Sequence, residues 1–140
     1  MYSKYKILQD KQIIIEFHSG VMTLEELELF TSNQIKDPFY NPDYNMLIDI
    51  RDVEVELNAE EVDKYVKYVL THDNIHGKRK DAILTNTSIQ VALASLYAGM
   101  QHLLKTQIEV FSTIESALRW IATSPISERE VSSIIEELKD

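Results

Sequence analysis

The stretch of sequence that decides the fold is MLIDIRDVEVELNAEE, residues 46–61. Its first five residues are apolar except for Asp49, and a short apolar run of this kind is typical of a β-strand that is covered on both faces. Its last part holds Asn58 and Glu61 at the spacing of a capping box, in which each side chain binds a free N–H group at the start of a helix. We therefore predict a buried strand, a short connection and a helix that begins at Asn58.

The same alternation of strand and helix recurs along the chain. A hydroxyl residue stands three positions before Glu or Gln at four further places where an apolar helical stripe begins: Thr23…Glu26, Thr87…Gln90, Ser112…Glu115 and Ser127…Glu130. Strands are predicted at 5–8, 12–17, 46–50, 81–84 and 107–111, and the first two form a hairpin. The predicted fold class is α/β, with a mixed sheet of about five strands in the order β-β-α-β-α-β-α-β-α and a C-terminal helix.

Helical spacing also predicts which residues face the core. The helix from Asn58 to about His72 would bury Val62, Tyr65, Val66, Val69 and Leu70. The helix that begins at Thr87 is predicted to be the longest, and it would bury Ile89, Leu93, Leu96, Tyr97, Met100 and Leu104. Residues 1–123 form the predicted domain, and 124–140 form an amphipathic helix that covers the same domain or makes a dimer contact.

Composition restricts the classes of function. The 140 residues carry a formal net charge of −9, which disfavours binding to nucleic acid or to an anionic membrane. The chain has no cysteine, no apolar signal region near Met1 and no apolar run near the ~20 residues that a membrane span needs. These features predict a cytoplasmic protein.

Two clusters of side chains are candidate sites, a histidine pair and a basic run. His72 and His76 have a spacing that could hold a metal on a helix, but the helix is predicted to end between them and no third ligand is evident, so no metal is predicted. The basic run Lys78-Arg79-Lys80 is interpreted as a solvated connection. No nucleophile motif and no glycine-rich phosphate loop is present, so we predict a protein without a cofactor that is not an enzyme.

Four short sequence segments resemble the SpoIIAA-like (STAS/SEC14) family of the STAS-like superfamily. They are Gly20 to Thr23, Leu47 to Asp52, Lys78 to Leu84 and, as the closest match, Val110 to Ile121 with its Phe, cap and Ala-Leu-Arg-Trp helix. The likeness covers about residues 5–122 and implies the fold of small bacterial regulatory domains. Anti-sigma-factor antagonists of this fold carry a phosphorylatable Ser where Asn58 stands here. The resemblance therefore implies the scaffold without the phosphate-controlled switch.

Topology predicts one ligand crevice. In open α/β sheets ligands bind beyond the carboxyl ends of parallel strands. That edge would gather Asp49, Thr85, Asn86, Thr87, Ser88 and Ser112. The competing interpretation is that Thr87 and Ser112 only cap helices.

The predicted function is that of a regulatory protein-interaction module, without catalysis. Its partner surface would be the acidic loop Asp52–Glu56 together with the following helix, with Asp52, Glu54, Glu56, Asn58 and Glu61 as the contact residues. The alternative is a carrier of an apolar small molecule or lipid, which predicts a pocket of at least ~300 Å³ between sheet and helices. A third hypothesis is an enzyme at the strand-end crevice. A homodimer is also compatible with the sequence.

Overall fold

The computed structural model describes all 140 residues as one α/β unit. Its elements are β1 (Tyr2–Leu8), β2 (Ile13–Met22), α1 (Leu24–Gln34), β3 (Asn45–Val55), α2 (Ala59–Leu70), β4 (Lys80–Leu84), α3 (Ser88–Ala98), a 3₁₀ turn η1 (Gln101–Leu103), β5 (Gln107–Phe111), α4 (Ile114–Ile121) and α5 (Glu128–Leu138). The order confirms the predicted fold class. No helix is both long enough and apolar enough to cross a membrane.

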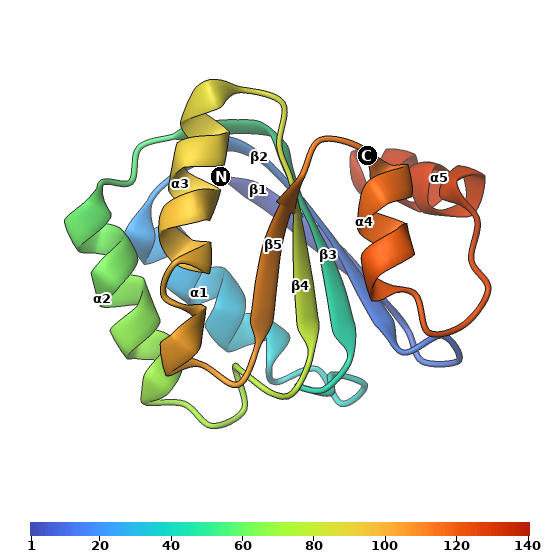
Figure 1. The fold of residues 1–140 in the computed structure, drawn as a ribbon, viewed down its shortest axis with the longest axis horizontal. Coiled ribbons are helices and arrows are strands. Elements are labelled where there is room, and N and C mark those ends of the chain that lie inside the picture. The colour runs from blue at the N-terminus through green and yellow to red at the C-terminus, as the bar shows by residue number, and fades with distance from the viewer.

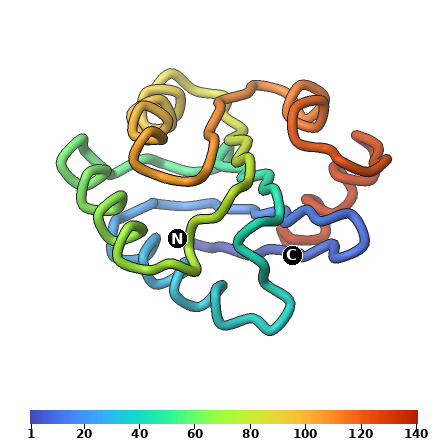
Figure 2. Tube along the Cα trace, turned by 60° about the horizontal axis from the view of Figure 1, so that its bottom comes forward, coloured from blue at the N-terminus to red at the C-terminus, as the bar shows by residue number.

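The five strands form one sheet in the order β1-β2-β3-β4-β5. β1 is antiparallel to β2, and the other neighbours are parallel, so the sheet is mixed as predicted. Helices α1, α2 and α3 cover one face, and α4 and α5 cover the other (Figure 1; Figure 2). A three-layer arrangement explains why the middle of β3 is apolar on both sides.

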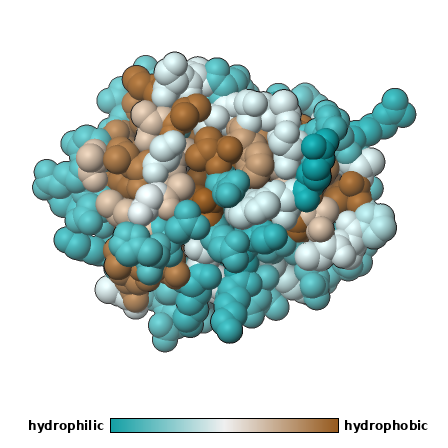
Figure 3. Space-filling view, in the orientation of Figure 1, coloured by the Kyte–Doolittle hydropathy of each residue, from teal (hydrophilic) through white to brown (hydrophobic).

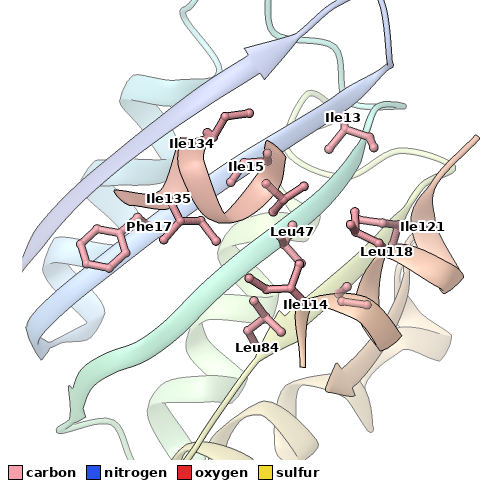
Figure 4. Packing of buried hydrophobic residues seen from close by; sticks show 13 residues of the cluster. Ile13, Ile15, Phe17, Leu47, Leu84, Ile114, Leu118, Ile121, Ile134 and Ile135 are labelled. Carbon is pink, nitrogen blue, oxygen red and sulfur yellow. The ribbon is translucent and has the colours of Figure 1, made fainter. Parts of the chain in front are cut away.

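Each face of the sheet has its own core. Alternate residues of the strands, such as Ile15 and Leu47, point toward α4 and α5, where they pack against Ile114, Leu118 and Ile135 (Figure 4). The opposite face of the sheet carries a smaller hydrophobic cluster, formed by Met22, Ile50, Val53, Ile83, Ala94 and Ile108. Side chains of a strand alternate between the two faces, so β3 contributes to both cores.

Helix α5 packs on its own domain. Val131 and Ile135 are fully buried in the same cluster as Ile15 of β2. The Tyr2 hydroxyl donates a hydrogen bond of 2.8 Å to the carbonyl of Leu138 and ties the helix end to β1. The apolar stripe of residues 128–138 is therefore covered by the sheet of the same chain.

β2 and β3 extend several residues beyond their predicted carboxyl ends, and this changes the acidic loop. β2 continues to Met22 past a register shift after Phe17, with Gly20 at φ +79°, a value that favours glycine. β3 runs beside it to Val55. The prediction of a loop over Asp52–Glu56 is therefore wrong, because Asp52 and Glu54 belong to β3 and only Glu56 follows it.

The predicted caps are correct at four helices of five. Asn58 and Thr87 form complete boxes with Glu61 and Gln90, and Thr23 and Ser127 each accept one backbone N–H. The prediction for Ser112 is wrong, because Thr113 caps α4 and accepts from the N–H of Ser116 at 3.2 Å.

The predicted inner face of the third helix is also wrong in part. α3 ends at Ala98 and has 11 residues, so α2, with 12, is the longest helix. Ile89 and Leu96 are 63% and 44% exposed, and Leu70 of α2 is 38% exposed. The surface over α3 is correspondingly apolar (Figure 3). Helical spacing alone misassigns this helix because α3 is apolar on nearly every side.

Candidate functional site

A cavity lies between the sheet and helices α1, α2 and α3. Its volume is about 110 Å³, and 15 of its 21 lining residues are hydrophobic. Strands β2, β3 and β4 form its floor, with Met46, Ile48 and Ile50 of β3 in the middle. Leu27 of α1 and Ala94 of α3 belong to its roof. The cavity lies where the carrier hypothesis placed a pocket, but it is smaller than the ~300 Å³ that this hypothesis predicted.

Charged side chains form part of the lining and lie at one end of the strands. Glu16 of β2 is opposite Ile48 of β3, and Asp81 is opposite Met46, so both carboxylates project from the amino-terminal halves of their strands. They are 5% and 2% exposed. Buried carboxylates require partners, and each of these has its own.

The first group is centred on Glu16. His18 Nε2 lies 2.9 Å from Glu16 Oε1 and, since a carboxylate only accepts, carries the proton between them. Gln34 Nε2 of α1 donates to Glu16 Oε2 at 2.8 Å. On the far side of the ring, His18 Nδ1 lies 2.7 Å from the Ser3 hydroxyl. The network joins β1, β2 and α1 and gives each carboxylate oxygen one partner.

The second group is the ion pair of Arg79 and Asp81. Arg79 Nε donates to Asp81 Oδ1 at 2.7 Å, and Nη2 approaches Oδ2 at 3.4 Å. Arg79 Nη1 donates at 3.1 Å to both the Tyr40 hydroxyl and the Pro42 carbonyl. Burial raises the pKa of Asp81, and the guanidinium opposes that rise. Burial alone would lower the pKa of Arg79, but the adjacent carboxylate raises it above its ordinary value.

The interpretation of residues 78–80 as a solvated connection is therefore wrong for Arg79. Lys78 is exposed, but Arg79 is only 8% exposed and reaches into the cavity lining. Lys80 is half-buried and donates to the Trp120 carbonyl at 3.3 Å. The alternation of a strand explains the difference, because the side chain of residue 79 follows the inward direction of residue 81.

Two tyrosines complete the polar lining. The Tyr65 hydroxyl lies 2.9 Å from Thr31 Oγ1, and Thr31 already donates to the Leu27 carbonyl, so Tyr65 is the donor. The ring of Tyr97 is 5.8 Å from that of Tyr65, and its hydroxyl has no hydrogen-bond partner in the protein. Burial raises the pKa of both phenols. Tyr97 is thus a polar residue of the lining whose hydroxyl makes no hydrogen bond within the protein.

The predicted strand-end crevice exists but gathers only part of its predicted residues. A solvent-facing hollow of about 260 Å³ is lined by Asp49 and Asn86, together with Arg51, Asp52 and Lys139 among others. Asp49 is paired with Arg51, whose Nε and Nη2 each donate to it at 2.9 Å. Four predicted residues do not line this hollow: Thr85, Thr87, Ser88 and Ser112. Thr85 donates to the Phe111 carbonyl, and Thr87 caps α3. The structure contains no group of three His, Asp or Glu residues that could hold a metal ion.

The predicted partner residues fall into two groups. Asp52, Glu54 and Glu56 are exposed and form no ion pair within the protein. Asn58 and Glu61 are occupied by the capping box of α2. The remaining charges on the outer face of α2 pair with each other, Lys64 with Glu60 and Lys67 with Asp63.

The buried charged and amide groups of the cavity were not identified from the sequence. Glu16 interrupts the apolar run Ile13 to Phe17, and that interruption is the signal that could have identified it. The contacts of His18 with Ser3 and Glu16 are those of a structural hydrogen-bonding residue. Gln34 and Tyr40 gave no signal, because polar residues near a helix end or in a loop are normally exposed.

Comparison with known proteins supports the fold. No protein-family model and no curated protein matches the chain. A crystal structure of an uncharacterized protein from the DUF3478 family with a SpoIIAA-like fold, from Shewanella loihica PV-4, matches it with a TM-score of 0.57 and 20% sequence identity. The match covers 85% of this chain and 91% of that chain. The chain therefore has a SpoIIAA-like fold, which confirms the resemblance seen in the sequence.

Proposed function

We propose that the protein binds a small, mainly apolar molecule in the cavity between the sheet and α1–α3, and that it acts as a binding protein without catalysis. The observation that carries the proposal is a mainly apolar cavity of about 110 Å³, with an unpaired Tyr97 hydroxyl and two buried carboxylates in its lining. A binding site typically combines an apolar wall with a few convergent polar groups.

The energetic cost of this cavity supports the proposal. Protein interiors contain few voids larger than a water molecule. At about 24 cal/mol per Å³ of enclosed empty volume, a space of 110 Å³ costs at most about 2.6 kcal/mol, and this value is an upper limit because the cavity is partly open to solvent. That is a large share of the ~5–15 kcal/mol by which a domain of this kind is stable. A ligand that fills the space offsets this cost.

The volume also limits what the ligand can be. An apolar cavity of ~150 Å³ is known to accept benzene, so 110 Å³ suits a molecule of similar or smaller size. A complete lipid needs a much larger site. The proposal therefore keeps the small-molecule part of the carrier hypothesis and not the lipid part.

Binding can be tested with simple probes and a matched pair of variants. Benzene and 1-butanol are titrated into the protein, and backbone amide shifts are followed by NMR. We expect saturable shifts for residues around the cavity. Ala94→Leu, which places a larger side chain in the cavity, should abolish them, and Ala92→Leu on the exposed side of α3 should leave them unchanged. If neither probe produced saturable shifts in the wild-type protein, the proposal would be wrong.

A second candidate function has its own supporting observation. Asp52, Glu54 and Glu56 form an exposed acidic strip along and just beyond the end of β3, and no cation of the protein pairs with it. Such a strip suits a basic surface on a protein partner, as a regulatory interaction module requires. Replacing the three residues by Asn, Gln and Gln should weaken partner capture and its salt dependence. Unchanged capture would exclude this surface.

A further inference from the structure

We infer that the ligand of the cavity carries a hydrogen-bond donor at its polar end, and that a small primary amine fits better than a carboxylate. The inference rests on the proposed function, because it specifies the chemistry of the same site. It follows from a count of donors and acceptors among the buried side chains that line the cavity, and from their charges.

The acceptors of the lining are only half used. Glu16 and Asp81 together offer four carboxylate oxygens, and each oxygen accepts one hydrogen bond from the protein. An ionised carboxylate has about four acceptor positions, so about half of this capacity remains. The Tyr97 hydroxyl, with no partner, can accept as well.

Most donors of the lining are used. Arg79 has five N–H groups, and four of them are directed at Asp81, Tyr40 and Pro42. The Tyr65 proton is given to Thr31. Gln34 donates to Glu16, as does the protonated nitrogen of His18. A ligand that only accepts hydrogen bonds would therefore find three side-chain donors without a partner: one N–H of Arg79, one N–H of Gln34 and the Tyr97 hydroxyl.

Charge favours the same class of ligand. The ionisable groups that face the polar end are Glu16, Asp81, Arg79 and His18, with the neutral phenols of Tyr40, Tyr65 and Tyr97. Two carboxylates and one guanidinium leave one negative charge when the imidazole is neutral. A ligand carboxylate would add a second buried negative charge, whereas an ammonium group would balance the first.

Four probes of similar size separate the alternatives. Butylamine, 1-butanol and butyrate share an alkyl chain and differ in the polar end, and benzene has no polar end. Each is titrated into the full chain at neutral pH and followed by NMR shifts of the cavity residues. We expect butylamine to bind at least about tenfold more tightly than butyrate, because like charges brought together in a buried site are strongly disfavoured.

One substitution tests the origin of the preference. Glu16→Gln removes a carboxylate at nearly constant shape, and it should reduce the preference of butylamine over 1-butanol. Glu109→Gln, at an exposed position of β5, is the matched control and should leave the preference unchanged. If both variants lost the preference for butylamine to the same extent, the preference would come from the net charge of the protein, and the inference would be overturned.

Titrations of the wild-type protein alone separate a failure of the amine preference from a failure of the proposed binding function. If butyrate bound as tightly as butylamine or more tightly, the inference about the ligand would be wrong and the proposed cavity function would stand. If none of the four probes bound, benzene and 1-butanol included, the proposed function itself would be wrong.

Discussion

Replacing Ala94 by Leu should make the protein more stable while it removes the ligand site. Ala94 is 2% exposed, lies on the inner side of α3 and lines the cavity of about 110 Å³. The substitution adds about three methylene-sized groups, each worth about 0.8 kcal/mol when buried, which gives an upper value of about 2.4 kcal/mol. The cavity term for the whole space is of the same size, at most about 2.6 kcal/mol.

Imperfect fit reduces this gain. Overpacking a side chain against fixed neighbours costs about 1–3 kcal/mol, and Leu is nearly as good a helix former as Ala. We therefore expect a net gain of about 1 kcal/mol in the free energy of unfolding. The gain should appear in urea titrations as a higher midpoint with an unchanged slope.

A matched control decides whether the cavity is the cause. Ala92→Leu changes the same residue type on the exposed side of α3, and it should shift stability by less than about 0.5 kcal/mol. If Ala94→Leu lost more than about 1 kcal/mol while Ala92→Leu was neutral, the space beside Ala94 would be too small for the added atoms. The reasoning about the cavity would then be refuted.

Three further predictions concern the scaffold. Gly77→Ala should destabilise the protein by more than about 1 kcal/mol in urea titrations, because a β-carbon there would collide with backbone atoms of Pro42. Gly99→Ala should be neutral or stabilising, because a β-carbon there would make only ordinary van der Waals contacts and the backbone angles are helical; equal effects of the two substitutions would contradict this. Burial and a hydrogen bond to a neighbouring carboxylate raise the pKa of Tyr5 from 10.0 to about 12. Between these values the folded phenol keeps a proton that the unfolded one has lost, so the free energy of unfolding should fall as pH rises from about 10 to 12, and Tyr5→Phe should flatten that fall. Ile135→Ala, at 1% exposure under the sheet, should cost about 2–5 kcal/mol by thermal or urea unfolding, and a cost below about 1 kcal/mol would show that α5 is not part of the core.

The fold was predictable because it depends on local signals that repeat. Apolar runs such as Met46 to Ile50 and caps such as Asn58 and Thr87 depend on residues close in sequence, and all of them lie where they were expected. The errors arose where distant contacts decide. β3 extends beyond Ile50 because β2 continues beside it past the register shift, and no residue of β3 alone reveals that.

The proposed cavity and the predicted strand-end crevice lie at different ends of the sheet. The strand-end rule correctly brought Asp49 and Asn86 together, but Asp49 is already paired with Arg51. The buried charges that line the cavity lie at the opposite ends of the strands and depend on pairs far apart in sequence, such as Glu16 with Gln34 and Arg79 with Tyr40. A single sequence shows that Glu16 is unusual in an apolar run, but it does not show what the residue meets.

The order of the strands determines how this protein can fold. Each strand of the sheet pairs with the strand before it in the chain, so the sheet can grow at one edge as successive segments arrive. Pairings between near neighbours in sequence cost little loop entropy and favour rapid folding. Helix α5 is the exception, because it returns across the whole chain to cover β1 and β2. We expect the face of β2 that carries Ile15 to stay uncovered until this last step, which makes the docking of α5 the point at which an intermediate could aggregate.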